Sequence, residues 1–174
     1  MNFEQVWAVT SKIGGFFEKE EAELYWSVLH RTPGPVVVEV GLENGRSTSI
    51  PAQYSKFVYP LTIHCVDNFS TFGDKGQRQF EDNMMEIQAL YILWKRPSHL
   101  MAGMFTDVSS ILIDADHDDS EVDCQTWIPQ LASGGWMLFH DYGREPWNIK
   151  EVVDRYCDGW YGETAGTLAA RQKP

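Results

Sequence analysis

Two short stretches place acids and histidines directly after β-favouring apolar residues. The stretch ILIDADHDD, residues 111–119, contains Asp114 and His117, and the stretch WMLFHDYG further on contains His140 and Asp141. Carboxylates are ligands for hard divalent cations, and a histidine can act as a general base near neutral pH. The two stretches form a metal or acid–base site only if the fold brings them together.

The pattern of segments along the chain predicts how these stretches are positioned. Apolar, β-favouring runs predict strands at 35–41, 61–67, 98–103, 109–114, 134–141 and 164–172. Segments with apolar residues at helical spacing predict helices at 16–34, 45–57, 77–95, 120–133 and 148–160. Strands that alternate with helices are typical of a parallel sheet with right-handed crossovers. The predicted fold class is therefore α/β.

Bulk properties exclude several classes of protein. The 174 residues suit a single domain, 1–174, in which the helical segment 1–34 packs on the sheet. A net charge of −11 argues against nucleic acid as a partner, since phosphate contacts need clustered Lys and Arg. No apolar run is long enough to span a membrane. Three widely spaced cysteines favour reduced thiols in the cytoplasm, and the oligomeric state stays open, a homo-oligomer included.

Ligands of parallel sheets bind outside the carboxyl ends of the strands. After the first expected strand, EVGLENG places Gly41 in a turn that a ligand can approach closely, although the turn could equally be structural. Glu43 stands where the dinucleotide motif G-x-G-x-x-G has glycine, which disfavours an NAD-dependent oxidoreductase. Asp67 ends the second strand, where it can accept both hydroxyls of a ribose or only cap a loop.

Asp114 and Asp141 end two neighbouring expected strands. Because adjacent strands lie about 4.8 Å apart, these carboxylates can share a cation such as Mg²⁺. His140 is either a third ligand or a hydrogen-bond partner of a neighbouring side chain. His117, three residues beyond Asp114, is placed to act as a general base. The acids that follow it are candidates for capping the next helix.

These motifs, taken together and in this order, resemble a known family. The stretches GGFFEKEEAELYWSVL, VVVEVGLENGRST, HCVDNF, LIDADH, WIPQLASGGWMLFHDYG and WNIKEVVDRY are similar to class I S-adenosylmethionine-dependent methyltransferases. Within this class the chain resembles the methyltransferase-24 group, which includes macrocin-type sugar O-methyltransferases. The resemblance covers nearly the whole chain. It implies a Rossmann-like sandwich with a mostly parallel seven-stranded sheet whose last strand is reversed.

The resemblance also implies roles for individual residues. The cofactor S-adenosylmethionine would contact Glu39, Gly41, Gly45, Ser47, Asp67, Gly103, Met104 and Asp114, with Asp67 on the ribose and Gly103 and Met104 at the adenine. A cation such as Mg²⁺ would be held by Asp114, His140 and Asp141. His117 would deprotonate a hydroxyl of a small-molecule acceptor, whose oxygen then attacks the sulfonium methyl group.

The chain departs from the family pattern in ways that keep a second interpretation open. Only MFTDV separates HLMAG from SSILID, so the helix between the third and fourth strands is expected to be shortened or missing. Pro51 falls where the family has a plain helix former. An O-methyltransferase is the main prediction. The alternative is a catalytically degenerate module that binds S-adenosylmethionine or S-adenosylhomocysteine, or a subunit of a larger assembly.

Overall fold

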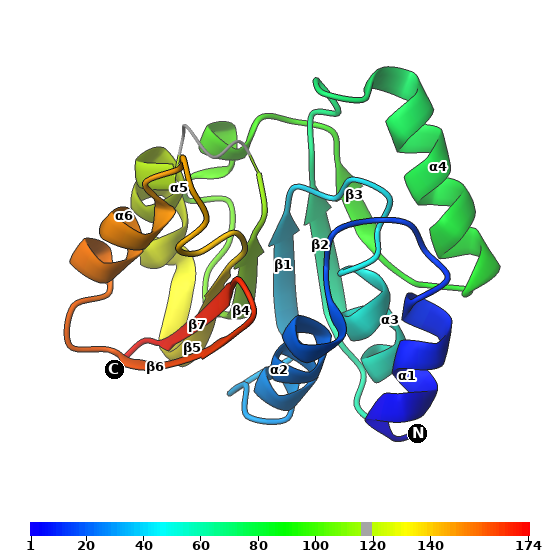
Figure 1. Ribbon diagram of the computed structural model, residues 1–174, viewed down its shortest axis with the longest axis horizontal. Helices are drawn as coiled ribbons and strands as arrows, with labels where there is room; N and C mark the ends of the chain where they lie inside the picture. Colours follow the sequence, from blue (N-terminus) through cyan, green and yellow to red (C-terminus); the bar gives the residue numbers. More distant parts are fainter. Residues whose placement is uncertain (116–119) are drawn as a thin grey trace.

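A seven-stranded sheet runs through the middle of the protein and positions the site (Figure 1). The computed structural model describes residues 1–115 and 120–174. The strands follow the order β3-β2-β1-β4-β5-β7-β6 across the sheet. Their bounds are β1 (Val36–Val40), β2 (Thr62–Val66), β3 (Ile92–Trp94), β4 (Val108–Ile113), β5 (Leu131–Phe139), β6 (Tyr161–Ala165) and β7 (Leu168–Gln172). All neighbouring pairs are parallel except those of β7, which runs antiparallel to β5 and β6. The predicted α/β sheet with a reversed last strand is confirmed.

Helices cover both faces of this sheet. The α-helices are α1 (Phe3–Thr10), α2 (Lys19–Leu29), α3 (Ser49–Phe57), α4 (Gly73–Glu86), α5 (Ser120–Trp127) and α6 (Ile149–Tyr156). Side chains of β1 alternate between the faces: Val37 packs with α1, α2 and α3, whereas Val38 and Val40 pack with α5 and α6. A third cluster packs α4 against β2 through Phe80 and Met84. Within the described residues, no helix is both long and apolar enough to cross a membrane.

The register of the central strands places their ends at one level. Val40 pairs with Val66 on β2 and with Ile113 on β4, and Ile113 pairs with Phe139 on β5. The residues that directly follow these strands are Gly41, Asp67, Asp114 and His140. Their backbone amides continue the hydrogen-bond ladder of the sheet, as in the bond from Asp114 N to Val40 O at 2.8 Å. Parallel pairing thus brings these four residues to a common edge.

The third strand lies elsewhere than predicted. β3 is Ile92–Trp94, in the stretch assigned to the end of a helix, and residues 98–101 form the 3₁₀ helix η1 (Ser98–Met101). The helix α4 stops at Glu86, and Gln88 then adopts a φ of +55°. The ring of Tyr91 still packs on Phe80, with centroids 5.3 Å apart, so the apolar spacing looks helical across the turn. The prediction of the third strand at 98–103 was therefore wrong. All residues of the connection from β3 to β4 are described, and η1 is the longest helix in it.

Candidate active site

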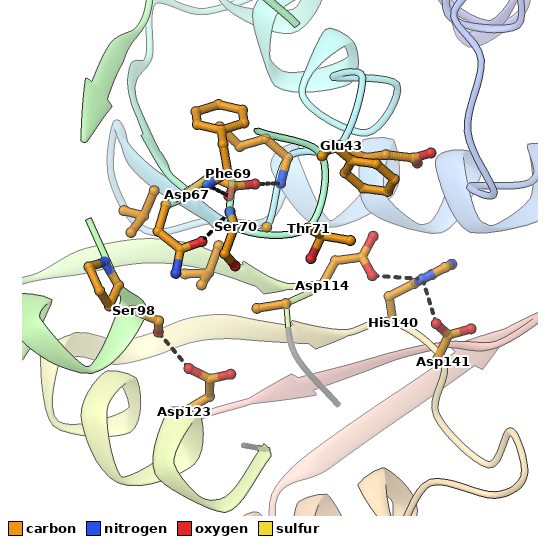
Figure 2. Close-up of a pocket in the computed structure, with 18 of the residues that line it drawn as sticks. Glu43, Asp67, Phe69, Ser70, Thr71, Ser98, Asp114, Asp123, His140 and Asp141 are labelled. Carbon is orange, nitrogen blue, oxygen red and sulfur yellow. Dashed lines mark hydrogen bonds and ion pairs between the residues drawn. The ribbon is translucent and has the colours of Figure 1, made fainter. Parts of the chain in front are cut away.

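A cavity of about 720 Å³ opens at the carboxyl ends of β1, β2, β4 and β5 (Figure 2). Of the residues singled out in the sequence, Gly41, Asp67, Asp114, His140 and Asp141 line it. Figure 2 shows Asp67 and Ser98 on one side of Asp114, and His140 and Asp141 on the other. The volume lies within the usual range for small-molecule sites. The cavity therefore has two halves that share Asp114.

The loop after β1 packs tightly against the end of β4. Gly41 has a φ of +84°, and a Cβ at this position would lie 2.0 Å from the carbonyl oxygen of Asp114. Gly45, with a φ of +83°, faces α4 instead, where a Cβ would come within 2.7 Å of Met84 Cε. Both positions require glycine because of neighbouring protein atoms. Gly45 does not line the cavity, and Gly41 does.

Glu39 and Ser47 lie beneath this loop rather than in the cavity. Both side chains are buried, and the Ser47 hydroxyl donates a 2.5 Å hydrogen bond to Glu39 Oε1. The other oxygen, Oε2, has no hydrogen-bond partner among the described residues. Burial raises the pKa of Glu39 to about 8, although the bond from Ser47 opposes the shift. Glu39 is therefore mostly neutral at pH 7, with one oxygen left without a hydrogen bond.

Asp67 organises the loops on the β2 side. Its Oδ2 accepts a hydrogen bond from the amide of Leu42 at 2.8 Å, and its Oδ1 accepts one from Phe69 at 2.6 Å. A carboxylate offers about four lone-pair sites, so each oxygen can still accept a hydroxyl from the cavity. Phe69 has a φ of +55°, an uncommon conformation for a bulky residue, and Glu43 has a φ of +45°. Strained backbone of this kind clusters at functional sites.

Residues after β3 supply the far wall of this half. The cavity is lined there by Arg96, Pro97, Ser98 and His99, and by Val122 and Asp123 of α5. The Ser98 hydroxyl donates to Asp123 Oδ1 at 2.5 Å and accepts from Trp127 Nε1 at 2.8 Å. Gly103 and Met104 are absent from this lining, and Met104 is 56% exposed. Their predicted position followed from the misplaced third strand.

The second half of the cavity holds a cluster of two acids and a histidine. His140 Nδ1 lies 3.0 Å from Asp114 Oδ1 and 3.6 Å from Asp141 Oδ2. One ligand atom from each residue lies within 4.8 Å of the others, which suits a metal ion. Asp141 has a φ of +55°, and its Oδ1 pairs with Arg144 Nη1 at 2.9 Å. The tertiary structure thus brings together the three residues predicted to bind a cation.

His140 is also contacted from behind by the N-terminal segment. Its Nε2 lies 3.4 Å from Glu21 Oε2, and the ring of Phe17 packs on the imidazole with centroids 5.3 Å apart. Burial alone would lower the pKa of His140, but the carboxylates of Asp114, Asp141 and Glu21 outweigh it and raise the pKa to about 12. Without a bound cation, His140 is therefore a cation that balances this acidic cluster.

Sequence patterns alone did not reveal the part played by the N-terminal segment. Phe16 lines the cavity and is 71% exposed, next to the buried Phe17. Glu21 reads locally as a capping-box residue of α2, because it accepts a hydrogen bond from the amide of Glu18. The only signal in the sequence was that Glu21, an acid, occupies a position on the apolar face of the expected helix. His117, the predicted base, lies outside the described residues.

Comparisons with known proteins agree with this fold. Residues 38–142 match the methyltransferase-24 family model, described as a methyltransferase domain. The chain belongs to this family, and it is accordingly an S-adenosylmethionine-dependent methyltransferase with a Rossmann-like fold. No curated protein sequence matches the chain.

Solved structures of low sequence identity share the fold. An S-adenosylmethionine-dependent O-methyltransferase from Thermotoga maritima has a TM-score of 0.71 at 10% identity, over 96% of this chain and 69% of that one. The O-methyltransferase NovP has a TM-score of 0.73 at 14% identity, over 91% and 83%. CalS11, a TDP-rhamnose 3′-O-methyltransferase of calicheamicin biosynthesis, has a TM-score of 0.63 at 11% identity, over 98% and 92%.

Proposed function

We propose that the protein transfers the methyl group of S-adenosylmethionine to a hydroxyl oxygen of a small acceptor, with help from a divalent cation. The observation that carries the proposal is the continuity of one cavity between Asp67 and the cluster of Asp114, His140 and Asp141. One half offers the chemistry for a nucleoside and the other the chemistry for binding and deprotonating a hydroxyl. The TDP-rhamnose acceptor named for CalS11 supports an acceptor of the sugar or secondary-metabolite type.

The cofactor half fits S-adenosylmethionine in its chemistry. Asp67 would accept the ribose hydroxyls while its present bonds to two backbone amides hold the carboxylate in place. Gly41 would lie along the methionine part, above the buried Glu39. Ser98 and His99, rather than Gly103 and Met104, would border the adenine. Because these contacts come from the loops after β1, β2 and β3, the cofactor would be held across the sheet edge.

The acidic cluster fits a divalent cation in its spacing. Neighbouring ligands of an octahedral cation with bonds of about 2.1 Å are roughly 3 Å apart. The separations of 3.0 and 3.6 Å from His140 Nδ1 to the two carboxylates are close to this value. Asp114 and Asp141 would hold the cation through oxygen, and His140 would add a nitrogen. When bound, the cation would acidify and orient the acceptor hydroxyl.

The chain's own residues would then complete the transfer. His117 would accept the proton of the acceptor hydroxyl, since it follows Asp114 by three residues. Asp67 and Asp114 would hold the two reactants in the orientation for in-line attack of that oxygen on the methyl carbon. Phe16 and Trp147 line the cavity and would exclude water from the bound reactants.

The test combines turnover with binding. His117→Ala should abolish methyl transfer from labelled S-adenosylmethionine while S-adenosylhomocysteine still binds in a calorimeter. Hydroxylated sugars and phenols would serve as the acceptor panel. Unchanged turnover in His117→Ala would reject this base.

A degenerate binding module is the second candidate. It is favoured by the short connection from β3 to β4, where η1 is the only helix and Leu100 is 56% exposed. A module of this kind would bind S-adenosylhomocysteine without transferring a methyl group to any acceptor. Absence of binding at millimolar S-adenosylmethionine would contradict both candidates.

A further inference from the structure

A buried carboxylate on α2 contacts the side of His140 that faces away from the cavity. Glu21, in the first turn of α2, is 2% exposed. Its Oε1 accepts hydrogen bonds from Thr167 N at 2.8 Å and from Thr167 Oγ1 at 2.7 Å. Its Oε2 accepts the amide of Glu18 at 2.7 Å and lies 3.4 Å from His140 Nε2. Helix capping explains the contact with Glu18 but not the contact with His140.

The contacts of Glu21 determine which nitrogen of His140 faces the cavity. The Glu21 carboxylate lies at Nε2, and the Phe17 ring packs against the imidazole. The remaining nitrogen, Nδ1, is directed toward Asp114 and Asp141. Figure 2 shows this nitrogen between the two carboxylates. A ring held in this way cannot turn to present Nε2 to the cavity without leaving the buried carboxylate.

A carboxylate behind the imidazole is typical of histidines that bind metals, and the 3.4 Å separation of His140 Nε2 and Glu21 Oε2 is an ion pair that a small shift would make a hydrogen bond. Such a histidine usually donates its second ring N–H to a carboxylate, which selects the tautomer and raises the basicity of the ligating nitrogen. Mg²⁺ prefers oxygen ligands, whereas imidazole nitrogen suits transition-metal dications. In this protein Glu21 would keep the proton of His140 on Nε2 and leave Nδ1 free to bind a metal ion.

We propose that Glu21 is a positioning residue that makes His140, through Nδ1, a nitrogen ligand of a transition-metal dication shared with Asp114 and Asp141. The inference rests on the cation-assisted transfer proposed above and goes beyond it, because it names the residue that orients His140 and the class of metal ion. It also assigns α2 a direct part in the site.

The first test uses the full chain, freed of metal and then loaded with Mn²⁺. Pulsed electron paramagnetic resonance should show coupling of the metal to a directly bound ¹⁴N nucleus, and His140→Ala should lose this coupling. Glu21→Gln should also lose it, because the amide that replaces Oε2 can donate to Nε2 and leave the proton on Nδ1. We expect its Mn²⁺ affinity to fall by a factor of about ten or more.

Two variants separate positioning from folding. Thr167→Val removes a hydroxyl that donates to Glu21 but leaves the contact with His140, and Glu23→Gln neutralises an exposed acid of the same helix. Both should keep the nitrogen coupling and bind Mn²⁺ within twofold of the wild type. A Thr167→Val variant that loses the coupling as Glu21→Gln does would show that Glu21 only anchors the fold, and would overturn the proposal.

A further measurement needs no variant of Glu21. In the wild-type protein loaded with Zn²⁺, ¹⁵N chemical shifts should show Nδ1 of His140 bound to the metal and Nε2 carrying a proton. The reverse assignment, or no nitrogen coupling to Mn²⁺, would overturn the proposal even if Glu21→Gln fails to fold. Calorimetry with S-adenosylhomocysteine distinguishes the two failures, since retained binding without a nitrogen ligand contradicts this inference alone.

Discussion

The carboxylate of Asp67, at the end of β2, accepts a hydrogen bond from the backbone amide of Leu42, in the loop after β1, at 2.8 Å. The loop after β1 and the loop after β2 are therefore held together by one side chain that also lines the cavity. Its second oxygen is bonded to the amide of Phe69. Loss of this carboxylate should consequently affect both stability and cofactor binding.

Replacement of Asp67 by Ala should weaken S-adenosylhomocysteine binding by a factor of ten or more. It should also lower the free energy of unfolding by about 1–3 kcal/mol, because two backbone amides lose a charged acceptor. Calorimetry and urea unfolding measure the two effects. Asp74→Ala is the matched control, since Asp74 lies on α4 with a side chain that is 78% exposed. Cofactor affinity within twofold of the wild type would contradict the assignment of Asp67.

Two glycines with similar backbone angles should respond very differently to alanine. Gly41 and Gly103 have φ values of +84° and +70°, so Ala costs about 1 kcal/mol at each through backbone strain alone. At Gly41 the new methyl group also meets the backbone of Asp114 at 2.0 Å, whereas nothing lies within 4 Å of it at Gly103. We expect Gly41→Ala to destabilise the protein by about 3 kcal/mol in total. Equal losses at both positions, measured by urea unfolding, would contradict this packing.

Stability should depend on pH through the buried Glu39. Its folded pKa of about 8 lies above the ordinary glutamate value of 4.5, so ionisation favours the unfolded chain. This group contributes no penalty below about pH 4 and lowers stability progressively as the pH rises from there to 8. The total is on the order of 5 kcal/mol at most. Glu39→Gln, which cannot ionise, should show a flatter pH profile of unfolding free energy; a profile parallel to that of the wild type would be inconsistent with a neutral Glu39.

Two residues on the same connection distinguish the adenine side proposed from the cavity lining from the one that the family resemblance implies. His99 lines the cavity, whereas Met104 is absent from its lining although both side chains are exposed. His99→Ala should weaken S-adenosylhomocysteine binding about fivefold through the loss of one ring contact worth roughly 1 kcal/mol. Met104→Ala should leave the affinity unchanged in the same calorimetric titration. A larger effect at Met104 would favour the position inferred from the sequence.

Local patterns predicted most of the sheet correctly. The runs that became β1, β2, β4 and β5 are apolar and are followed by Gly, Asp or His, which is the form of a buried parallel strand that ends at a site. The prediction of the third strand failed because Tyr91, the residue just before β3, packs on Phe80 and so continues the apolar spacing of the preceding helix. The spacing of apolar residues cannot distinguish the end of a helix from a strand when the strand has only three residues.

The sequence by itself determined the α/β class and the residues that follow most of the strands. The spacing of apolar residues in strands and helices, and the Gly or polar residues that end them, are local properties of the sequence. Parallel pairing then required Gly41, Asp67, Asp114 and His140 to share an edge. Only the tertiary structure decided that Glu39 is buried beneath its loop, that Gly103 stands away from the cavity, and that Glu21 reaches His140. These outcomes depend on contacts between residues far apart in the chain, such as Glu21 with Thr167, which no local pattern encodes.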